Sequence, residues 1–291
     1  MRDKIALLLF MFLFSSHLSL LSQSKGNPVA YRIFDAKGKK ASYAKMLKAS
    51  RDADVFFFGE KHNDPIVHWL QLRFAKDLYG RDSSLTVGME MFEADGQVIL
   101  DEYFGGFISE KSFEKEARLW PNYDTDYKPV LDFAKEEGLR LVATNVPRRY
   151  ASSVYKRGFD VLDSLPAASK KFLPPLPVAY DPDLPGYKKM LEMGGKHANP
   201  NLPKAQAIKD ATMAYFISRN IKLGTPFLHL NGSYHSDNDE GILWYLRRYD
   251  PELRFFTIST VTQDQLDKLD EEYIGKADFI LCVPTDMTKT R

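Results

Sequence analysis

The sequence predicts an α/β domain: a mainly parallel central sheet flanked by helices, with an irregular and helical cap over the carboxyl ends of the strands. Two observations lead to this prediction. Short, nearly continuous apolar runs alternate with helical patterns along the chain, which is the arrangement of βαβ units. One long stretch rich in proline interrupts the alternation, and it cannot be a central strand because proline has no backbone donor.

The apolar runs have the length of strands and lack polar alternation, so we expect strands that are buried on both faces. The predicted strands span residues 55–58, 85–91, 139–146, 226–230, 254–258 and 279–283. Apolar residues at helical spacing predict helices between them. These helices span residues 66–79, 127–137, 204–221, 240–249 and 263–272.

The interruption lies at residues 148–203 and includes a Leu-Pro-Pro-Leu-Pro run at residues 173–177. We expect it to cover one end of the sheet as part of the cap, together with a second segment near residues 95–125. Long loops are either functional or simply irregular, so a lid and a passive surface loop both remain open.

The N-terminal segment, residues 1–24, has the pattern of a signal peptide. Arg2 and Lys4 precede an apolar run over residues 5–14, and Ser22 and Ser24 form a small-x-small cleavage signal. We therefore expect an exported protein, periplasmic or associated with an outer membrane, whose single domain spans residues 25–291. An uncleaved anchor is the alternative. The segment contains no cysteine, so lipidation through an N-terminal cysteine is not expected.

The overall composition narrows the choice of partners. The formal net charge is +1, and a balanced charge argues against a nucleic-acid partner, which selects a basic face. The one cysteine, Cys282, lies in an apolar run, and we expect it to be buried as a small hydrophobe. A single thiol forms no internal disulfide, so the hydrophobic core must hold the fold.

Polar residues gather at or just after the ends of four predicted strands. They are Glu60, His62, Glu90, Asn145, Arg148 and His235. In open α/β sheets ligands bind in the crevice beyond the carboxyl ends of the strands, so we expect the functional site there.

Two of these strands end in Gly-x-x-His turns, at residues 59–62 and 232–235. In each turn we expect glycine to allow an unusual backbone and histidine to be carried toward the next helix. Glu60 and Glu90 add carboxylates that cannot stay unpaired beside buried strands.

This set of residues allows three kinds of chemistry. It could hold a divalent metal such as Mn, Co or Zn, with His62, Glu90 and His235 as ligands. It could pair a carboxylate with an imidazole as a general base. It could also be a buried hydrogen-bond network that only closes the end of the sheet.

Other polar residues are predicted to support the site or to lie apart from it. Gln206 and Asp210 are spaced i, i+4 in one predicted helix and therefore share one face, which is either a wall behind the site or a solvated surface. We expect a packing or surface role for His68 and a core position for His229.

Five motifs together resemble the ChaN-like haem-uptake family of the Tiki superfamily, which also includes TraB, PrgY and the erythromycin esterases. The motifs lie at residues 58–62, 88–92, 145–148, 206–214 and 232–235. They occur in the order seen in that family, and the resemblance extends from about residue 56 to residue 283.

The resemblance implies an exported haem-binding protein of iron uptake. It further implies haem at a homodimer interface, iron held by a tyrosine, and an outer-membrane haem receptor as partner. Tyrosines near the excursion are the expected ligands: Tyr150, Tyr155, Tyr180 and Tyr187. The chain departs from the family in lacking the lipidated cysteine of ChaN.

The enzymes of the superfamily imply an alternative, a metal-dependent hydrolase of the esterase or peptidase type. In that case Glu60 or His62 would activate water, Glu90 would hold the metal or the base, and His235 would stabilise the developing charge. Asn145, Arg148, Gln206 and Asp210 would support them. We favour haem binding.

Overall fold

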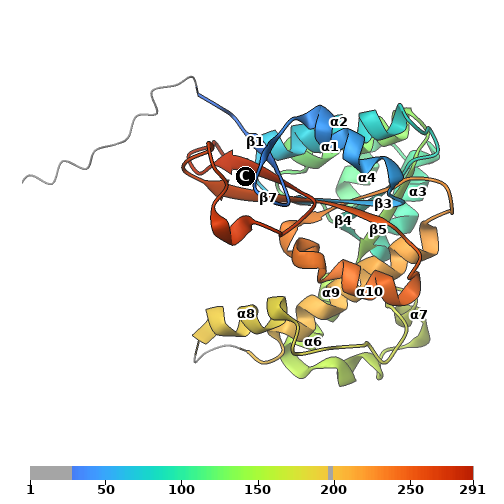
Figure 1. Ribbon diagram of the computed structural model, residues 1–291. Coiled ribbons are helices and arrows are strands. Elements are labelled where there is room, and N and C mark those ends of the chain that lie inside the picture. The colour runs from blue at the N-terminus through green and yellow to red at the C-terminus, as the bar shows by residue number, and fades with distance from the viewer. Residues whose placement is uncertain (1–27, 196–198, 291) are drawn as a thin grey trace, which may run out of the picture.

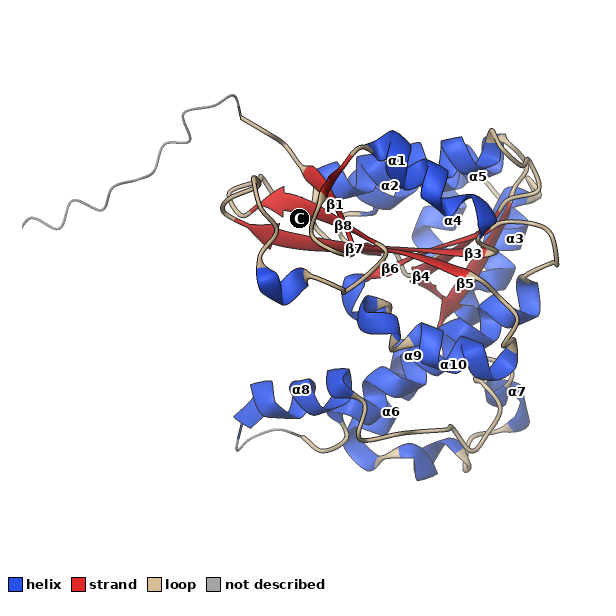
Figure 2. Cartoon of the chain, in the orientation of Figure 1, coloured by secondary structure: helices blue, strands red, loops and turns tan. Residues whose placement is uncertain are grey.

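The computed structural model describes residues 28–195 and 199–290, so the predicted signal peptide at residues 1–24 lies outside the described residues. The chain forms three layers, with a central sheet between two groups of helices (Figure 1, Figure 2). None of the helices in the described part of the chain is both long and hydrophobic enough to cross a bilayer.

The sheet has eight strands in the order β2-β1-β8-β7-β3-β6-β4-β5. The strands are β1 (Arg32–Asp35), β2 (Lys40–Ala41), β3 (Val55–Glu60), β4 (Thr86–Glu93), β5 (Arg140–Asn145), β6 (Phe227–Gly232), β7 (Phe255–Gln263) and β8 (Phe279–Pro284). From β8 to β5 all neighbours are parallel, whereas β1 runs antiparallel to β8 and to β2. The predicted, mainly parallel α/β fold is therefore confirmed.

Helices cover both faces of the sheet. They are α1 (Tyr43–Ala49), α2 (Pro65–Tyr79), α3 (Gln97–Phe104), α4 (Glu110–Glu116), α5 (Lys128–Glu136), α6 (Arg148–Arg157), α7 (Ala167–Lys170), α8 (Pro185–Gly194), α9 (Leu202–Asn220) and α10 (Ile242–Tyr249). Apolar side chains of α2 and α5 pack on one face, and those of α9 and α10 pack on the other. The central strands are buried on both faces, as their continuous apolar sequences predict.

Local sequence explains where α2 begins. The Asp64 carboxylate accepts hydrogen bonds from the backbone N–H groups of Ile66 and Val67, and Pro65 occupies the first turn, where its missing donor costs nothing. The loop that carries His62 therefore ends at a well-defined helix start.

In their described parts, the two segments expected to form a cap contain several short helices. Residues 95–125 include α3 and α4, and residues 148–203 include α6, α7 and α8. A π-helical turn, Tyr123–Tyr127, leads from the first segment into α5, and such turns occur often at functional sites.

One predicted helix is wrong. Residues 263–272 form no α-helix, because β7 continues to Gln263, which pairs with Pro284 of β8. The Gln263 side chain then donates to the carbonyls of Gln265 and Lys268 and accepts from the N–H of Asp270. These bonds stabilise a loop in place of a helix, even though two leucines have helical spacing. The sequence also did not predict β1, β2 or α1, whose apolar patterns are short.

Candidate functional site

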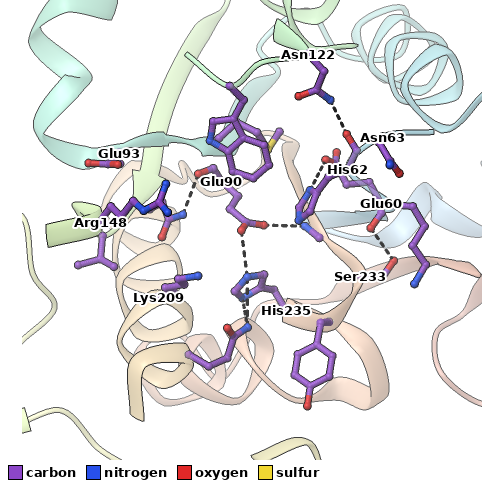
Figure 3. Close-up of a pocket in the computed structure, with 18 of the residues that line it drawn as sticks. Glu60, His62, Asn63, Glu90, Glu93, Asn122, Arg148, Lys209, Ser233 and His235 are labelled. Atoms are coloured by element: carbon purple, nitrogen blue, oxygen red, sulfur yellow. Dashed lines mark hydrogen bonds and ion pairs between the residues drawn. The ribbon is translucent and has the colours of Figure 1, made fainter. Parts of the chain in front are cut away.

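The carboxyl ends of β3, β6, β4 and β5 lie side by side and open into one pocket of about 1030 Å³, called here the strand-end cavity (Figure 3). The pairing of Glu60 with Gly232 in the β3–β6 register brings the two Gly-x-x-His turns together. All six polar residues predicted at the strand ends line the cavity: Glu60, His62, Glu90, Asn145, Arg148 and His235. The structure thus brings together residues that are far apart in the sequence.

Glu60 is buried and accepts three side-chain hydrogen bonds. One carboxylate oxygen accepts from Nδ1 of His62 at 2.9 Å and from the hydroxyl of Tyr127 at 2.8 Å. The other accepts from Nε2 of Gln71 at 2.6 Å. These bonds compensate the burial of the carboxylate and hold it in one orientation toward His62.

His62 differs from Glu60 in being partly open to the cavity, with 44% of its side chain exposed. Its ring packs edge-on against Trp120 at a centroid distance of 4.9 Å. Burial opposes the positive charge of the imidazole, but the hydrogen bond and the charge of Glu60 outweigh it, so the pKa of His62 is raised above its usual value.

The second Gly-x-x-His turn forms a buried chain of charges. His235 contacts Glu90 through Nε2 at 3.1 Å and Asp210 through Nδ1 at 2.5 Å. Glu90 also accepts from the backbone N–H of Gly232 at 2.7 Å, and Asp210 accepts from the hydroxyl of Tyr187 at 3.1 Å. The imidazole therefore lies between two carboxylates, each of which has one further donor.

The charges of His235 and Glu90 support each other, whereas burial raises the pKa of Asp210 above its usual value despite the neighbouring imidazole. Burial alone would lower the pKa of His235, but Glu90 and Asp210 raise it to about 10. Burial likewise opposes the charge of Glu90, yet His235 and the backbone donor hold the pKa of Glu90 well below its usual range. At neutral pH His235 is consequently an imidazolium with both N–H groups donating.

The two glycines allow close packing and not the unusual backbone that we expected. A Cβ atom on Gly232 would lie 2.8 Å from the ring atoms Cε1 and Nε2 of His62. A Cβ atom on Gly59 would lie 2.9 Å from the carbonyl oxygen of Ile258 and from Cα of Ser233. Each glycine is needed because another part of the site occupies the space of a side chain.

The structure does not support the predicted divalent-metal set of His62, Glu90 and His235. Among the described residues no group of three or more His, Cys, Asp or Glu side chains is arranged to hold a metal ion. The physical reason is the ion-pair chain: both nitrogens of His235 face carboxylates, and a protonated imidazole has no lone pair for a metal.

The predicted supporting residues lie around the same cavity. Asn145 donates from Nδ2 to the carbonyl of Glu90 at 3.1 Å, and the side-chain amide of Gln206 lies 2.9 Å from Nδ1 of His235. Asp210 stands behind His235, so the helix face shared by Gln206 and Asp210 is a wall of the site. Arg148 lines the cavity.

The four tyrosines expected as haem ligands are absent from the cavity lining. Tyr187 is buried and donates to Asp210, Tyr180 stacks on Tyr187, and the hydroxyl of Tyr150 accepts from Arg149. Tyr155 is 41% exposed on α6. The tyrosine that does line the cavity is Tyr234, within the second Gly-x-x-His turn.

Sequence reasoning missed several residues that hold His62. His68 is buried, with Nδ1 3.0 Å from Gln71 and Nε2 3.3 Å from the carbonyl of His62. Asn122 donates to the same carbonyl at 2.5 Å. The i, i+3 spacing of His68 and Gln71 was a usable signal, whereas Asn122 and Tyr127 come from a segment that nothing in the sequence directs to this site. His229 is a core histidine as expected, with 0% exposure.

The fold and the cavity define the class: an α/β protein with a polar and partly aromatic pocket at the carboxyl edge of a mainly parallel sheet. A family model described as "Haem-binding uptake, Tiki superfamily, ChaN" matches residues 46–246, and the chain belongs to this family. The match confirms the resemblance inferred from the sequence motifs.

Two solved structures show the same fold. ChaN of Campylobacter jejuni, in a structure that describes cofacial haem binding, aligns with a TM-score of 0.66 and 20% identity over 86% of this chain and 96% of that chain. A mutant of the erythromycin esterase EreC in its open conformation aligns with a TM-score of 0.52 and 11% identity over 90% and 99% of the two chains. At these identities the likeness shows the fold alone.

One curated relative covers a smaller part of the chain. Protein RETICULATA-RELATED 5, chloroplastic, of Arabidopsis thaliana is 24% identical over 168 residues, which are 52% of this chain and 22% of that protein. The match spans only about a fifth of that relative's length.

Proposed function

We propose that this protein binds haem in the strand-end cavity and serves haem or iron uptake. The observation that carries the proposal is the cavity itself, in a chain of the haem-binding family. Its volume of about 1030 Å³ lies at the upper end of the range for small-molecule sites, as the size of a porphyrin requires.

The lining of the cavity suits a flat apolar ring with two carboxylates. Apolar side chains form part of the wall: Met91, Leu119, Trp120, Pro121, Val146 and Met190. Arg148 and Lys209 also line it, and neither side chain forms an ion pair or hydrogen bond within the described residues. In Figure 3 both lie on the side away from His62. Free cations at this wall are suited to the propionates of haem.

A haem titration followed by absorption spectroscopy tests this function. We expect saturable haem binding by the wild type. In an Arg148→Ala/Lys209→Ala variant the affinity should fall about tenfold, which corresponds to roughly 1.4 kcal/mol of lost charge pairing. Haem binding by this variant should also depend less on salt than binding by the wild type. The matched control is Arg73→Ala/Lys268→Ala, which removes the same charges from exposed sites. Absence of saturable binding, or an equal loss in the control, would refute the proposal.

The proposal extends to export and to a homodimer. The signal-like pattern at residues 1–24 supports export to a periplasm or to an outer membrane, and cell fractionation with N-terminal sequencing tests it. The Campylobacter protein binds haem cofacially, and a face-to-face pair needs two copies of the chain if each strand-end cavity holds one haem. Light scattering with and without haem tests the dimer. An outer-membrane receptor as haem donor rests on the uptake role of the family alone.

Hydrolysis is not favoured. The predicted hydrolase depends on a metal, and no group of three or more His, Cys, Asp or Glu side chains among the described residues is arranged to hold one. The comparison with an esterase extends to the fold only.

A further inference from the structure

The turn between β3 and α2, residues 61–64, forms one wall of the strand-end cavity. Lys61, His62 and Asn63 line the cavity, and all three residues are exposed. The backbone of the turn itself supplies one hydrogen bond, from the N–H of Asp64 to the carbonyl of Lys61 at 3.1 Å. Neighbouring segments must therefore hold the rest of this wall in place.

The first of these segments is the π-helical turn before α5, together with the residue in front of it. Asn122 donates from Nδ2 to the carbonyl of His62 at 2.5 Å (Figure 3). The same amide group also donates to a carboxylate oxygen of Asp126 at 2.6 Å. Asp126 is 2% exposed, and a hydrogen bond to an ionised carboxylate is stronger than one between neutral groups. Asp126 thus orients the amide group that holds His62.

The second segment follows β8 and comprises residues 285–290. The hydroxyl of Thr290 donates to the same carboxylate oxygen of Asp126 at 2.5 Å. The backbone N–H of Thr290 donates to the carbonyl of Asn63 at 3.0 Å. Two hydrogen bonds of one residue therefore connect this segment to the turn and to the buried carboxylate behind it.

Lys289 adds an ion pair to the carboxylate of Asp64, with 2.7 Å between Nζ and Oδ2. The side chain of Asp64 is 0% exposed, so the loss of this partner would leave a buried carboxylate with one donor fewer. Most of the segment lies at the surface, where residues 285, 286, 288 and 289 are exposed. The segment is therefore attached to the turn mainly by polar contacts of Lys289 and Thr290, and it is called here the strap.

We propose that the strap, residues 285–290, keeps the His62 wall of the strand-end cavity in place, with Lys289 and Thr290 as positioning residues. Neither of these two residues lines the cavity, so both act through the turn. When the strap detaches, the carbonyl of Asn63 loses its donor, and the two buried carboxylates lose one partner each. The turn then opens more often and releases a bound ligand faster. This inference concerns the cavity wall and goes beyond the haem binding proposed above.

Hydrogen exchange of the whole protein, without ligand, tests the strap. The variant Lys289→Met/Thr290→Val removes the ammonium group and the hydroxyl and keeps side chains of similar size. We expect the amide hydrogens of residues 59–66 to exchange about tenfold faster than in the wild type, because hydrogen bonds to charged groups are lost. The exchange rate should change little in low concentrations of urea, because a local opening exposes little surface whereas global unfolding exposes much.

Two further variants are the controls. Lys289→Arg/Thr290→Ser keeps the charge and the hydroxyl, so residues 59–66 should exchange as in the wild type. Lys268→Met/Thr225→Val removes the same two groups from sites whose ion pair and hydrogen bond lie elsewhere, and it should also leave exchange in the turn unchanged. With haem bound, transfer of haem to apomyoglobin should be faster from Lys289→Met/Thr290→Val than from either control.

Three results would overturn the inference. Faster exchange that is confined to residues 285–290, with the turn unchanged, would show that the strap does not hold the turn. An acceleration in the turn that grows steeply with urea would assign the effect to global stability. An equal acceleration in Lys268→Met/Thr225→Val would show that the effect is not specific to the strap. Absence of haem binding would refute the proposed function alone, because the exchange measurement needs no ligand.

Discussion

Replacing His235 tests the buried ion-pair chain. In His235→Gln two buried carboxylates, Glu90 and Asp210, face a neutral side chain. Removing one partner of a buried ion pair costs about 3–5 kcal/mol, a large part of the roughly 5–15 kcal/mol by which a domain is stable. We expect this loss in the free energy of unfolding at neutral pH.

The pH dependence gives a sharper test. The pKa of His235 is raised from 6.5 to about 10 in the folded protein, so its contribution to stability is complete below pH 6.5 and is lost as pH rises toward 10. Within this window the contribution falls by about 1.4 kcal/mol per pH unit. The stability difference between wild type and His235→Gln should therefore narrow by about 3 kcal/mol from pH 7 to pH 9.

Urea unfolding followed by far-UV circular dichroism at pH 7, 8 and 9 measures this difference, and subtracting the variant removes the titration of groups that do not contact His235. Asp210→Asn is the second variant. It keeps a side chain of the same size and leaves His235 with one carboxylate, so the alkaline loss should be smaller than in the wild type. A stability difference between wild type and His235→Gln that stays constant from pH 7 to pH 9 would refute the ion-pair chain.

Two further predictions concern packing. Gly232→Ala places a Cβ atom against the His62 ring and should lower the free energy of unfolding in urea by about 1–3 kcal/mol. The control is Gly96→Ala, whose Cβ meets nothing within 4 Å and which should leave stability unchanged or raise it by about 0.4–1 kcal/mol. Equal effects of the two substitutions would contradict the close-packing role of Gly232. Burial raises the pKa of the Cys282 thiol to about 12, so alkylation should be at least about 100-fold slower in native buffer than in denaturant, and comparable rates would place this thiol at the surface.

The strands were predictable because a central parallel strand is apolar on both faces, and Val55 to Phe58 has no polar residue. The ends of the strands were harder to predict. The sequence-based prediction stopped at the last apolar residue, whereas β3 continues to Glu60 and β7 to Gln263. Hydrogen bonding to neighbouring strands extends a strand into polar residues, and this depends on which strands are neighbours.

Much of the site followed from strand ends alone, since parallel strands place their carboxyl ends at one edge. The prediction did not include the residues that hold His62 in place, such as Trp120, Asn122 and Tyr127. They come from the segment between β4 and α5, and their distance to His62 depends on how α5 packs beside α2. The protonation of His235 could not be predicted from the sequence either, because it depends on the contacts of His235 with both Glu90 and Asp210.

The position of β3 in the sheet has a consequence for synthesis of the protein. Both of its neighbours, β6 and β7, come later in the chain, and Glu60 pairs with Gly232, 172 residues further on (232 − 60). At roughly 5–20 residues per second, the ribosome needs about 9–34 s to reach that partner. During this time an aromatic strand has two unpaired edges, a state prone to aggregation. The nascent chain should therefore depend on a holding chaperone until β6 emerges.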